Sequence, residues 1–286
     1  MAASPRTTSA RPAPCDHCGA TRTREVLRKN GHVYLECQEC GLVRADMAPE
    51  AFFGLNEETF EGSLDHYAAK SYTPKKQRRY ARRLRGLEPH RGAGRLCEVG
   101  ANVGGFLAAA RRAGWNPVGV EPVAACAEWA RGNQGLDVRP TTLEDAAFPE
   151  GSFDVVYSNA VLEHLTSPRA VLDEIRRVLR PGGVTLCDTV NWASQTRERL
   201  GGGWKLADPL IHYHLFTPST LAGLCEAAGL EVVRLRSHGV RLRPNAAPRL
   251  TGAARWVEEL RKLPRSARAR RDLSGESIAV LARRPG

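Results

Sequence analysis

The sequence contains no stretch of about 18 or more apolar residues, the length that a membrane-crossing helix needs. Its first dozen residues, MAASPRTTSARP, are small and polar, and they lack the apolar run of a secretory signal. These two absences predict no membrane partner and a cytoplasmic location. The composition of the same segment predicts a disordered lead-in over residues 1–12.

A disulfide framework is also missing, although the chain has eight cysteines. Four of them form two tight pairs near the N-terminus. The other four are isolated in apolar or helical surroundings, where cysteine behaves as a small core residue: Cys97, Cys126, Cys187 and Cys225.

The bulk composition is that of an ordinary globular protein, with 286 residues, 42% hydrophobic and 26% charged. This length accommodates one large domain and a small one. The formal net charge is +11, and basic residues concentrate at 75–85 and 261–271. Such clusters are typical of solvated helix faces or tails, and the alternative is contact with a polyanion such as nucleic acid.

The paired cysteines predict a metal site. Cys15 and Cys18 precede Gly19, and Cys37 and Cys40 precede Gly41, in two C-x2-C-G turns. Four thiolates suit a tetrahedral Zn²⁺ with no open position, so a structural ion is expected. Between the turns, Asn30-Gly31 separates two short apolar segments and signals a hairpin. We therefore predict a zinc ribbon over residues 13–46, in preference to a redox dithiol pair.

Residues 47–88 are rich in charged and aromatic side chains and predict a helical linker arm, with a basic helix over 74–87. The main interpretation is an arm that packs the ribbon against the following domain. A second interpretation is a lid, in which Tyr67 or Tyr72 closes over a ligand.

Residues 89–286 alternate short apolar strands with amphipathic helices. This pattern predicts an α/β fold with a doubly wound, mostly parallel, seven-stranded sheet. The expected strands are 94–100, 116–121, 136–139, 152–158, 184–190, 230–235 and 277–283. The expected helices between them are 106–113, 124–131, 169–179 and 218–228. Ligands of such sheets bind at the carboxyl ends of the strands.

The first strand leads into a glycine-rich turn that contains Gly100, Asn102 and Gly104 and opens a helix. Glycines allow the backbone to approach a ligand closely, and the helix N-terminus offers free N–H groups. Glu121 ends the second strand, where an acid can accept hydrogen bonds from ribose hydroxyls. The alternative for Glu121 is a solvated acid at a strand end.

The order of these motifs over residues 90–237 resembles the class I S-adenosylmethionine methyltransferases. Glu98 resembles the acid of their first motif and Glu121 the ribose-binding acid. The segment with Leu143 and Glu144 resembles the one that frames adenine, and the strand ending at Asn159 resembles their fourth-strand motif. The resemblance implies that S-adenosylmethionine is bound by Glu98, Gly100, Asn102, Gly104, Glu121, Pro122, Leu143, Glu144 and Asn159.

More narrowly, the chain resembles bacterial members that carry a four-cysteine ribbon before the methyltransferase domain. That resemblance implies a small-molecule substrate of the natural-product or sugar type. Asn102 stands where the usual loop has glycine, a form similar to sugar-nucleotide C-methyltransferases with zinc modules. Those chains are much longer and have an added C-terminal domain.

Methyl transfer to oxygen, the expected acceptor, needs a base near neutral pKa, which points to histidine. His212 and His214 lie after the fifth strand, at the expected substrate edge of the sheet. The alternative is that this segment orients a loop or contacts the cofactor.

Residues 239–274 predict an insertion with a basic amphipathic helix over 254–263, which either caps the substrate pocket or packs at the sheet edge. Two other functions stay open. One is RNA methylation, which would use the ribbon and the basic surface. The other is a non-catalytic binding protein on the same fold. The sequence does not give the oligomeric state.

Overall fold

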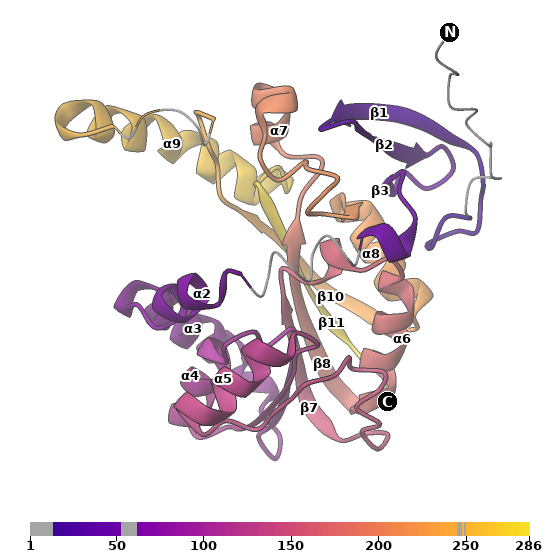
Figure 1. Ribbon diagram of the computed structural model, residues 1–286, viewed down its shortest axis with the longest axis vertical. Coiled ribbons are helices and arrows are strands. Elements are labelled where there is room, and N and C mark those ends of the chain that lie inside the picture. The colour runs from indigo at the N-terminus through magenta and orange to yellow at the C-terminus, as the bar shows by residue number, and fades with distance from the viewer. Residues whose placement is uncertain (1–13, 53–61, 245–247, 249) are drawn as a thin grey trace, which may run out of the picture.

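A computed structural model describes residues 14–52, 62–244, 248 and 250–286. The expected disordered lead-in at residues 1–12 lies outside these residues. Figure 1 shows one layered α/β body, with a small sheet from the N-terminal region on one side of it.

The main sheet has seven strands in the order β10-β11-β8-β7-β4-β5-β6, which confirms the predicted fold class. The neighbours from β8 to β6 are all parallel, and only β11 runs antiparallel to both of its neighbours. The strands are β4 (Arg95–Val99), β5 (Asn116–Val120), β6 (Val138–Arg139), β7 (Phe153–Asn159), β8 (Leu179–Val190), β10 (Glu231–His238) and β11 (Ser277–Arg283).

Helices cover both faces of this sheet, because successive residues of a buried strand point to opposite sides. Val155 of β7 belongs to a core formed with α3 (Pro74–Leu87), α4 (Gly105–Arg112) and α5 (Ala124–Gln134). Its neighbour Val156 belongs to the core formed with α6 (Pro168–Val178) and α8 (Pro218–Ala227). The sheet is therefore the middle layer of three, as Figure 1 shows. A further helix, α2 (Leu64–Ser71), precedes α3, and η1 (Glu88–His90) follows it.

Local sequence signals fix where several helices begin. Thr73 caps α3 by accepting a hydrogen bond from the Lys76 backbone N, and Pro74 occupies the first turn. Thr217 and Thr220 form a reciprocal capping box at the start of α8, again with a proline in the first turn. These caps explain why both helices begin where the sequence predicts.

The N-terminal region forms a second, four-stranded sheet in the order β1-β2-β3-β9. β1 (Thr23–Lys29) and β2 (His32–Cys37) are the predicted hairpin. Asn30 and Gly31 both have positive φ, 53° and 78°, as the turn requires. β3 (Val43–Ala45) pairs with β2.

The fourth strand of that sheet comes from far along the chain. β9 (His214–Leu215) pairs with β3 through Val43↔Leu215 and Arg44↔His214. A separate apolar core joins the two regions, with Tyr34 and Val43 from the ribbon and Trp204, Tyr213 and Leu215 from the later segment. The ribbon region thus shares a sheet and a core with the expected methyltransferase domain.

η2 (Leu162–His164) follows β7. The chain between β8 and α8 contains two short helices, α7 (Gln195–Leu200) and η3 (Gly201–Gly203). The predicted insertion contains α9 (Gly252–Asp272), a helix twice as long as the expected 254–263. Within the described part of the chain, no helix combines the length and the apolar character needed to cross a membrane.

Candidate functional site

The glycine-rich turn lies between β4 and α4, and its backbone has the left-handed conformations that its sequence suggests. Gly100, Asn102 and Gly104 have φ values of 70°, 49° and 72°. A Cβ atom on Gly104 would lie 2.3 Å from Leu136 Cδ1, and one on Gly100 would lie 2.4 Å from Val161 Cγ2. Asn102 tolerates the left-handed conformation because its side-chain Oδ1 accepts a hydrogen bond from Val103 N at 2.8 Å. The departure from glycine therefore preserves the turn.

Glu121 faces this turn from the end of β5. Its carboxylate accepts hydrogen bonds from the backbone N of Asn102 at 2.8 Å and of Val123 at 2.9 Å. The side chain is 6% exposed, so it is not the solvated strand-end acid that the sequence left open. Burial raises the pKa of Glu121, and the two backbone hydrogen bonds act in the opposite direction. The neighbouring Pro122 is exposed.

Glu98 lies inside the sheet beneath the turn and is also 6% exposed. Burial, and then the nearby Glu121 carboxylate, raise its pKa well above the usual value. Its Oε2 is buried without a hydrogen-bond partner in the structure. A buried acceptor of this kind is costly unless a ligand or water satisfies it, which is typical of a binding site.

The linker arm contacts the same turn, a contact that was not predicted from the sequence. The Tyr72 hydroxyl donates to the carbonyl of Val103 at 2.8 Å, and Gln77 Nε2 donates to the carbonyl of Gly105 at 3.2 Å. Burial raises the pKa of Tyr72 to about 12, which keeps the hydroxyl protonated as a donor. The aromatic residues of the arm were the sequence signal for this contact. The arm therefore packs directly on the glycine turn.

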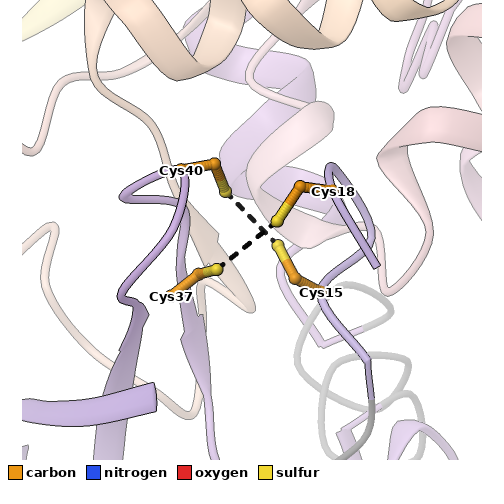
Figure 2. Close-up of side chains that lie close together, drawn as sticks. All are labelled: Cys15, Cys18, Cys37 and Cys40. Carbon is orange, nitrogen blue, oxygen red and sulfur yellow. Dashed lines mark hydrogen bonds between the residues drawn. The ribbon is translucent and has the colours of Figure 1, made fainter. Parts of the chain in front are cut away.

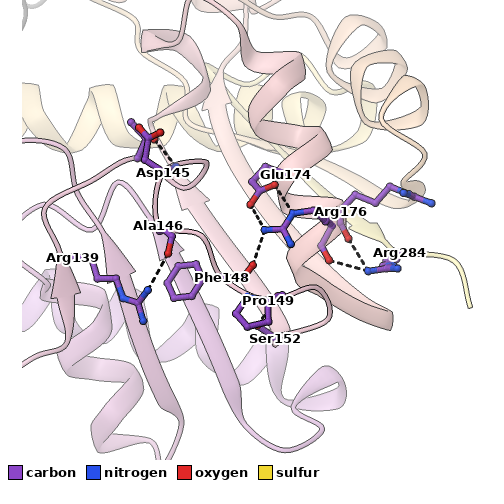
Figure 3. Close-up of polar contacts among 11 residues, drawn as sticks. Arg139, Asp145, Ala146, Phe148, Pro149, Ser152, Glu174, Arg176 and Arg284 are labelled. Atoms are coloured by element: carbon purple, nitrogen blue, oxygen red, sulfur yellow. Dashed lines mark hydrogen bonds and ion pairs between the residues drawn. The ribbon is translucent and has the colours of Figure 1, made fainter.

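The segment expected to frame adenine follows β6. Leu143 is buried in the core, whereas Glu144 is exposed. Two arginines fix the loop beyond it. Arg139 donates to the carbonyl of Ala146 at 3.1 Å (Figure 3). Arg177 donates to the carbonyl of Phe148 at 2.6 Å. This anchoring holds the Leu143–Glu144 turn at the carboxyl edge of β6.

Asn159 ends β7, and the strand register places it beside Asp188 of β8. No role was predicted for Asp188, which is 6% exposed and accepts a hydrogen bond from Arg83 of α3 at 2.7 Å. This ion pair ties the arm to the edge of the sheet where ligands bind. An acidic residue at the end of the fifth strand was the available signal for it.

His212 lies against the segment that follows β7. Its Nδ1 is 2.6 Å from the carbonyl oxygen of Leu206, which can only accept, so Nδ1 carries the proton and Nε2 offers a lone pair. Its ring lies 4.9 Å from that of His164. Burial lowers the pKa of His212, although the Leu206 hydrogen bond and Asp208 oppose this shift. The imidazole is therefore neutral at neutral pH.

His214 is more deeply enclosed, with 1% exposure. Its Nδ1 donates to the carbonyl of Leu165 at 2.8 Å, and burial lowers its pKa to about 4. It belongs to β9, opposite Arg44 of the ribbon. The structure thus separates the two candidate histidines: His212 adjoins the segment after β7, and His214 lies in the joint between the two sheets.

The atoms of Glu163, His164 and His212 form a compact polar group. One ligand atom from each lies within 4.8 Å of the others, so the group has the donor set for a divalent cation. Thr189 Oγ1 donates to Glu163 at 2.6 Å, and burial raises the pKa of Glu163 to about 7. Neither Glu163 nor His164 was among the residues predicted for the site.

The four N-terminal cysteines converge as predicted. Figure 2 shows the thiols of Cys15, Cys18, Cys37 and Cys40 pointing toward one centre. Cys15 Sγ lies 3.5 Å from Cys40 Sγ, and Cys18 Sγ lies 3.6 Å from Cys37 Sγ. Thiolates around a tetrahedral Zn²⁺ at 2.3 Å are separated by about 3.8 Å. The thiol spacing therefore fits a zinc ion.

Comparisons with known proteins agree with this architecture. The model of a methyltransferase-domain family matches residues 69–235. A ubiquinone biosynthesis O-methyltransferase of Cereibacter sphaeroides is 36% identical over 34% of this chain and 42% of its own length. One of Dinoroseobacter shibae is 30% identical over 54% of this chain and 66% of its own length. The matched regions thus span less than two thirds of these relatives.

A solved structure has the same fold. It is the 1,6-didemethyltoxoflavin-N1-methyltransferase of Burkholderia thailandensis, with bound 1,6-didemethyltoxoflavin and S-adenosylhomocysteine. It is 17% identical to this chain, with a TM-score of 0.54, and the alignment covers 92% of this chain and 100% of that one. At this identity the likeness concerns the fold alone.

Replacing Gly104 tests whether the turn requires its left-handed backbone. Gly104→Ala should lower the free energy of unfolding by about 1 to 3 kcal/mol, because a Cβ there meets Leu136 and the positive φ is strained. Gly132→Ala is the matched control: this exposed glycine of α5 has no heavy atom within 4 Å of a new Cβ, so its stability should stay the same or rise. Urea unfolding measures both, and equal midpoints for the two variants would contradict the geometry.

Proposed function

This chain belongs to the methyltransferase-domain family, and from that premise we propose that it transfers a methyl group from S-adenosylmethionine to an oxygen of a small molecule. The observation that carries the proposal is the pair of buried carboxylates, Glu98 and Glu121, beside a glycine turn with left-handed backbone at the carboxyl edge of the sheet. The family match and the named O-methyltransferase relatives support it.

The residues of the turn fit the cofactor. Glu98 Oε2 is a buried acceptor without a partner, and Gly100 and Gly104 leave space that a Cβ would fill. Glu121 lies at the end of the second strand of the domain, where a carboxylate can accept hydrogen bonds from ribose hydroxyls. These would replace the hydrogen bonds that it now accepts from the backbone N of Asn102 and Val123. Asn102, Pro122, Leu143, Glu144 and Asn159 complete the proposed cofactor site at the ends of the first strands.

When bound, S-adenosylmethionine supplies an electrophilic methyl group on a sulfonium. The protein must then align the acceptor, exclude water and remove the acceptor proton. His212 has the properties of that base, since it is neutral and its Nε2 lone pair is set by the Leu206 hydrogen bond. His214 would act by positioning, because it is enclosed between the sheets. The natural-product or sugar type of acceptor remains part of the proposal.

We also propose that Cys15, Cys18, Cys37 and Cys40 bind a structural Zn²⁺. Four thiols around one centre leave no coordination position for a substrate, so the ion would stabilise the ribbon and take no part in the reaction.

Cofactor binding is tested by calorimetric titration with S-adenosylhomocysteine. Glu121→Ala should weaken binding at least about tenfold, because the ribose hydroxyls lose a charged acceptor. Glu128→Ala, an exposed acid on α5, should bind like the unaltered protein. Absence of binding to the unaltered protein would refute methyl transfer itself, whereas equal binding by both variants would refute only the role of Glu121.

The base is tested by the pH dependence of kcat with a hydroxyl acceptor found by screening. Because burial lowers the pKa of His212, its neutral form should persist as pH falls, and kcat should stay constant from pH 8 to below about 6.5. His212→Asn should reduce kcat about 100-fold with little change in S-adenosylhomocysteine affinity. His90→Asn, at the opposite edge of the sheet, is the control. A rate that already declines above pH 7, or full activity of His212→Asn, would contradict this role.

Metal analysis of the purified protein should find one zinc ion per chain, which Cys37→Ser loses. Cys126→Ser alters a buried cysteine of α5 outside the cluster and should retain the ion. A metal-free unaltered protein that is fully folded would rule out the zinc assignment.

A further inference from the structure

α9 carries its apolar residues on the side that faces solvent. Trp256 is 73% exposed, Leu260 61% and Leu263 64%, and Val257 is 46% exposed. At about 100° per residue, these four side chains and Ala253 lie on one face of the helix. This face is called the α9 stripe below.

The opposite face of α9, which packs on the protein, is polar. Its less exposed positions are Glu258, Lys262, Arg265 and Ala269. The Arg265 carbonyl accepts from Gln195 at 3.1 Å and the Ala269 carbonyl from Ser237 at 2.5 Å, while Lys262 pairs with Glu258 at 2.9 Å. The helix is therefore fixed to the body through polar contacts, and its amphipathic pattern is inverted relative to a helix that packs on a core.

The charges around the stripe indicate what covers it. α9 has seven basic and three acidic residues, and Glu259 and Asp272 are paired with Lys262 and Arg268. Arg255 and Arg261 flank the stripe in its first turns and are exposed. A second copy of this chain would bring two positive surfaces together, which is unfavourable. Nucleic acid would satisfy the arginines, and its bases can stack on Trp256, but it offers no aliphatic surface for Leu260 and Leu263.

We propose that α9 is a membrane-docking helix that lies in the surface of an anionic bilayer. A face with tryptophan and leucine beside arginines is the pattern of helices that bury an apolar side at the headgroup boundary. A spanning segment, whose absence led to the expectation of no membrane partner, is not needed for this mode of binding. The proposal does not depend on the methyl-transfer reaction.

The position of α9 gives the docking a direction. β10 runs parallel to β8 and ends at His238, and β11 begins again at Ser277 opposite Val190. α9 lies in the connection between these two points, and its last residue, Asp272, is close in sequence to Ser277 of β11. The C-terminal end of the helix therefore adjoins the carboxyl edge of the sheet, where the proposed cofactor and acceptor sites lie. Figure 1 shows it extending outward from that edge. Docking would bring this edge toward the bilayer, and an acceptor with an apolar tail would be within reach.

The test is cosedimentation of the full chain with vesicles of phosphatidylcholine and phosphatidylglycerol at 70:30, and of phosphatidylcholine alone. We expect binding to the anionic vesicles that weakens as salt is raised, with a blue shift of Trp256 fluorescence. Trp256→Ser combined with Leu260→Ser should reduce binding at least about tenfold, and Arg255→Gln with Arg261→Gln should reduce the salt dependence. Val233→Ser removes a 47% exposed apolar side chain on β10 and should bind normally.

Circular dichroism verifies that each variant is folded, which is expected because the altered side chains face solvent. The proposal is overturned if the unaltered protein does not bind anionic vesicles in about 0.1 M salt, or if the α9 double variant binds as well as Val233→Ser. It is also overturned if sedimentation shows a dimer that the double variant disrupts, or if a single-stranded RNA probe binds through the same residues. If the unaltered protein binds the vesicles but does not bind S-adenosylhomocysteine, this proposal stands and the proposed methyl transfer is refuted.

Discussion

The pairing of β3 with β9 is the contact on which the arrangement of the proposed acceptor site depends. It pairs residue 43 with residue 215 and residue 44 with residue 214. A strand of the N-terminal ribbon is therefore hydrogen-bonded to the segment that carries both candidate histidines. That segment has only two residues of its own in strand conformation. Its position is set by what surrounds it, because short isolated strands are not stable alone.

Polar contacts from three directions complete this support. The Tyr34 hydroxyl of β2 donates to the carbonyl of His212 at 2.6 Å, and Lys29 reaches the carbonyl of Trp204 at 3.0 Å. From the other side, the Tyr213 backbone N donates to the carbonyl of Glu163 at 2.6 Å. Buried polar groups need such partners, and here the ribbon provides several of them. The cysteine cluster that organises the ribbon is therefore connected, through the hairpin, to the orientation of His212.

The sequence was sufficient for features with a local or periodic signal. The βα alternation predicted all seven strands of the main sheet, and the Asn30-Gly31 turn and the basic helix over 74–87 were confirmed. The start of β8 was missed by five residues, because Leu179 pairs with Phe153 before the Pro-Gly-Gly sequence that suggested an interruption.

The missed features are those made by distant partners. β3 and β9 are three and two residues long, too short for any periodicity. β3 forms by pairing with β2 and β9, and β9 forms by pairing with β3. Likewise Arg83 and Asp188 are 105 residues apart, and Tyr72 meets Val103 only once the arm has packed. For α9 the sequence predicted an amphipathic helix but not which face would be outward. That choice was decided by the polar anchors at Arg265 and Ala269, which turn the apolar stripe to solvent.

The most direct test of the coupling between ribbon and acceptor segment is hydrogen exchange, measured by mass spectrometry, on the unaltered chain and on Cys37→Ser. If the ribbon holds the acceptor segment, residues 206–216 should exchange faster in the variant together with the hairpin at 23–37, while β4 and β7 keep their protection. Faster exchange confined to the hairpin, with residues 206–216 unchanged, would contradict the account. It would show that the histidine segment is ordered by the main domain alone.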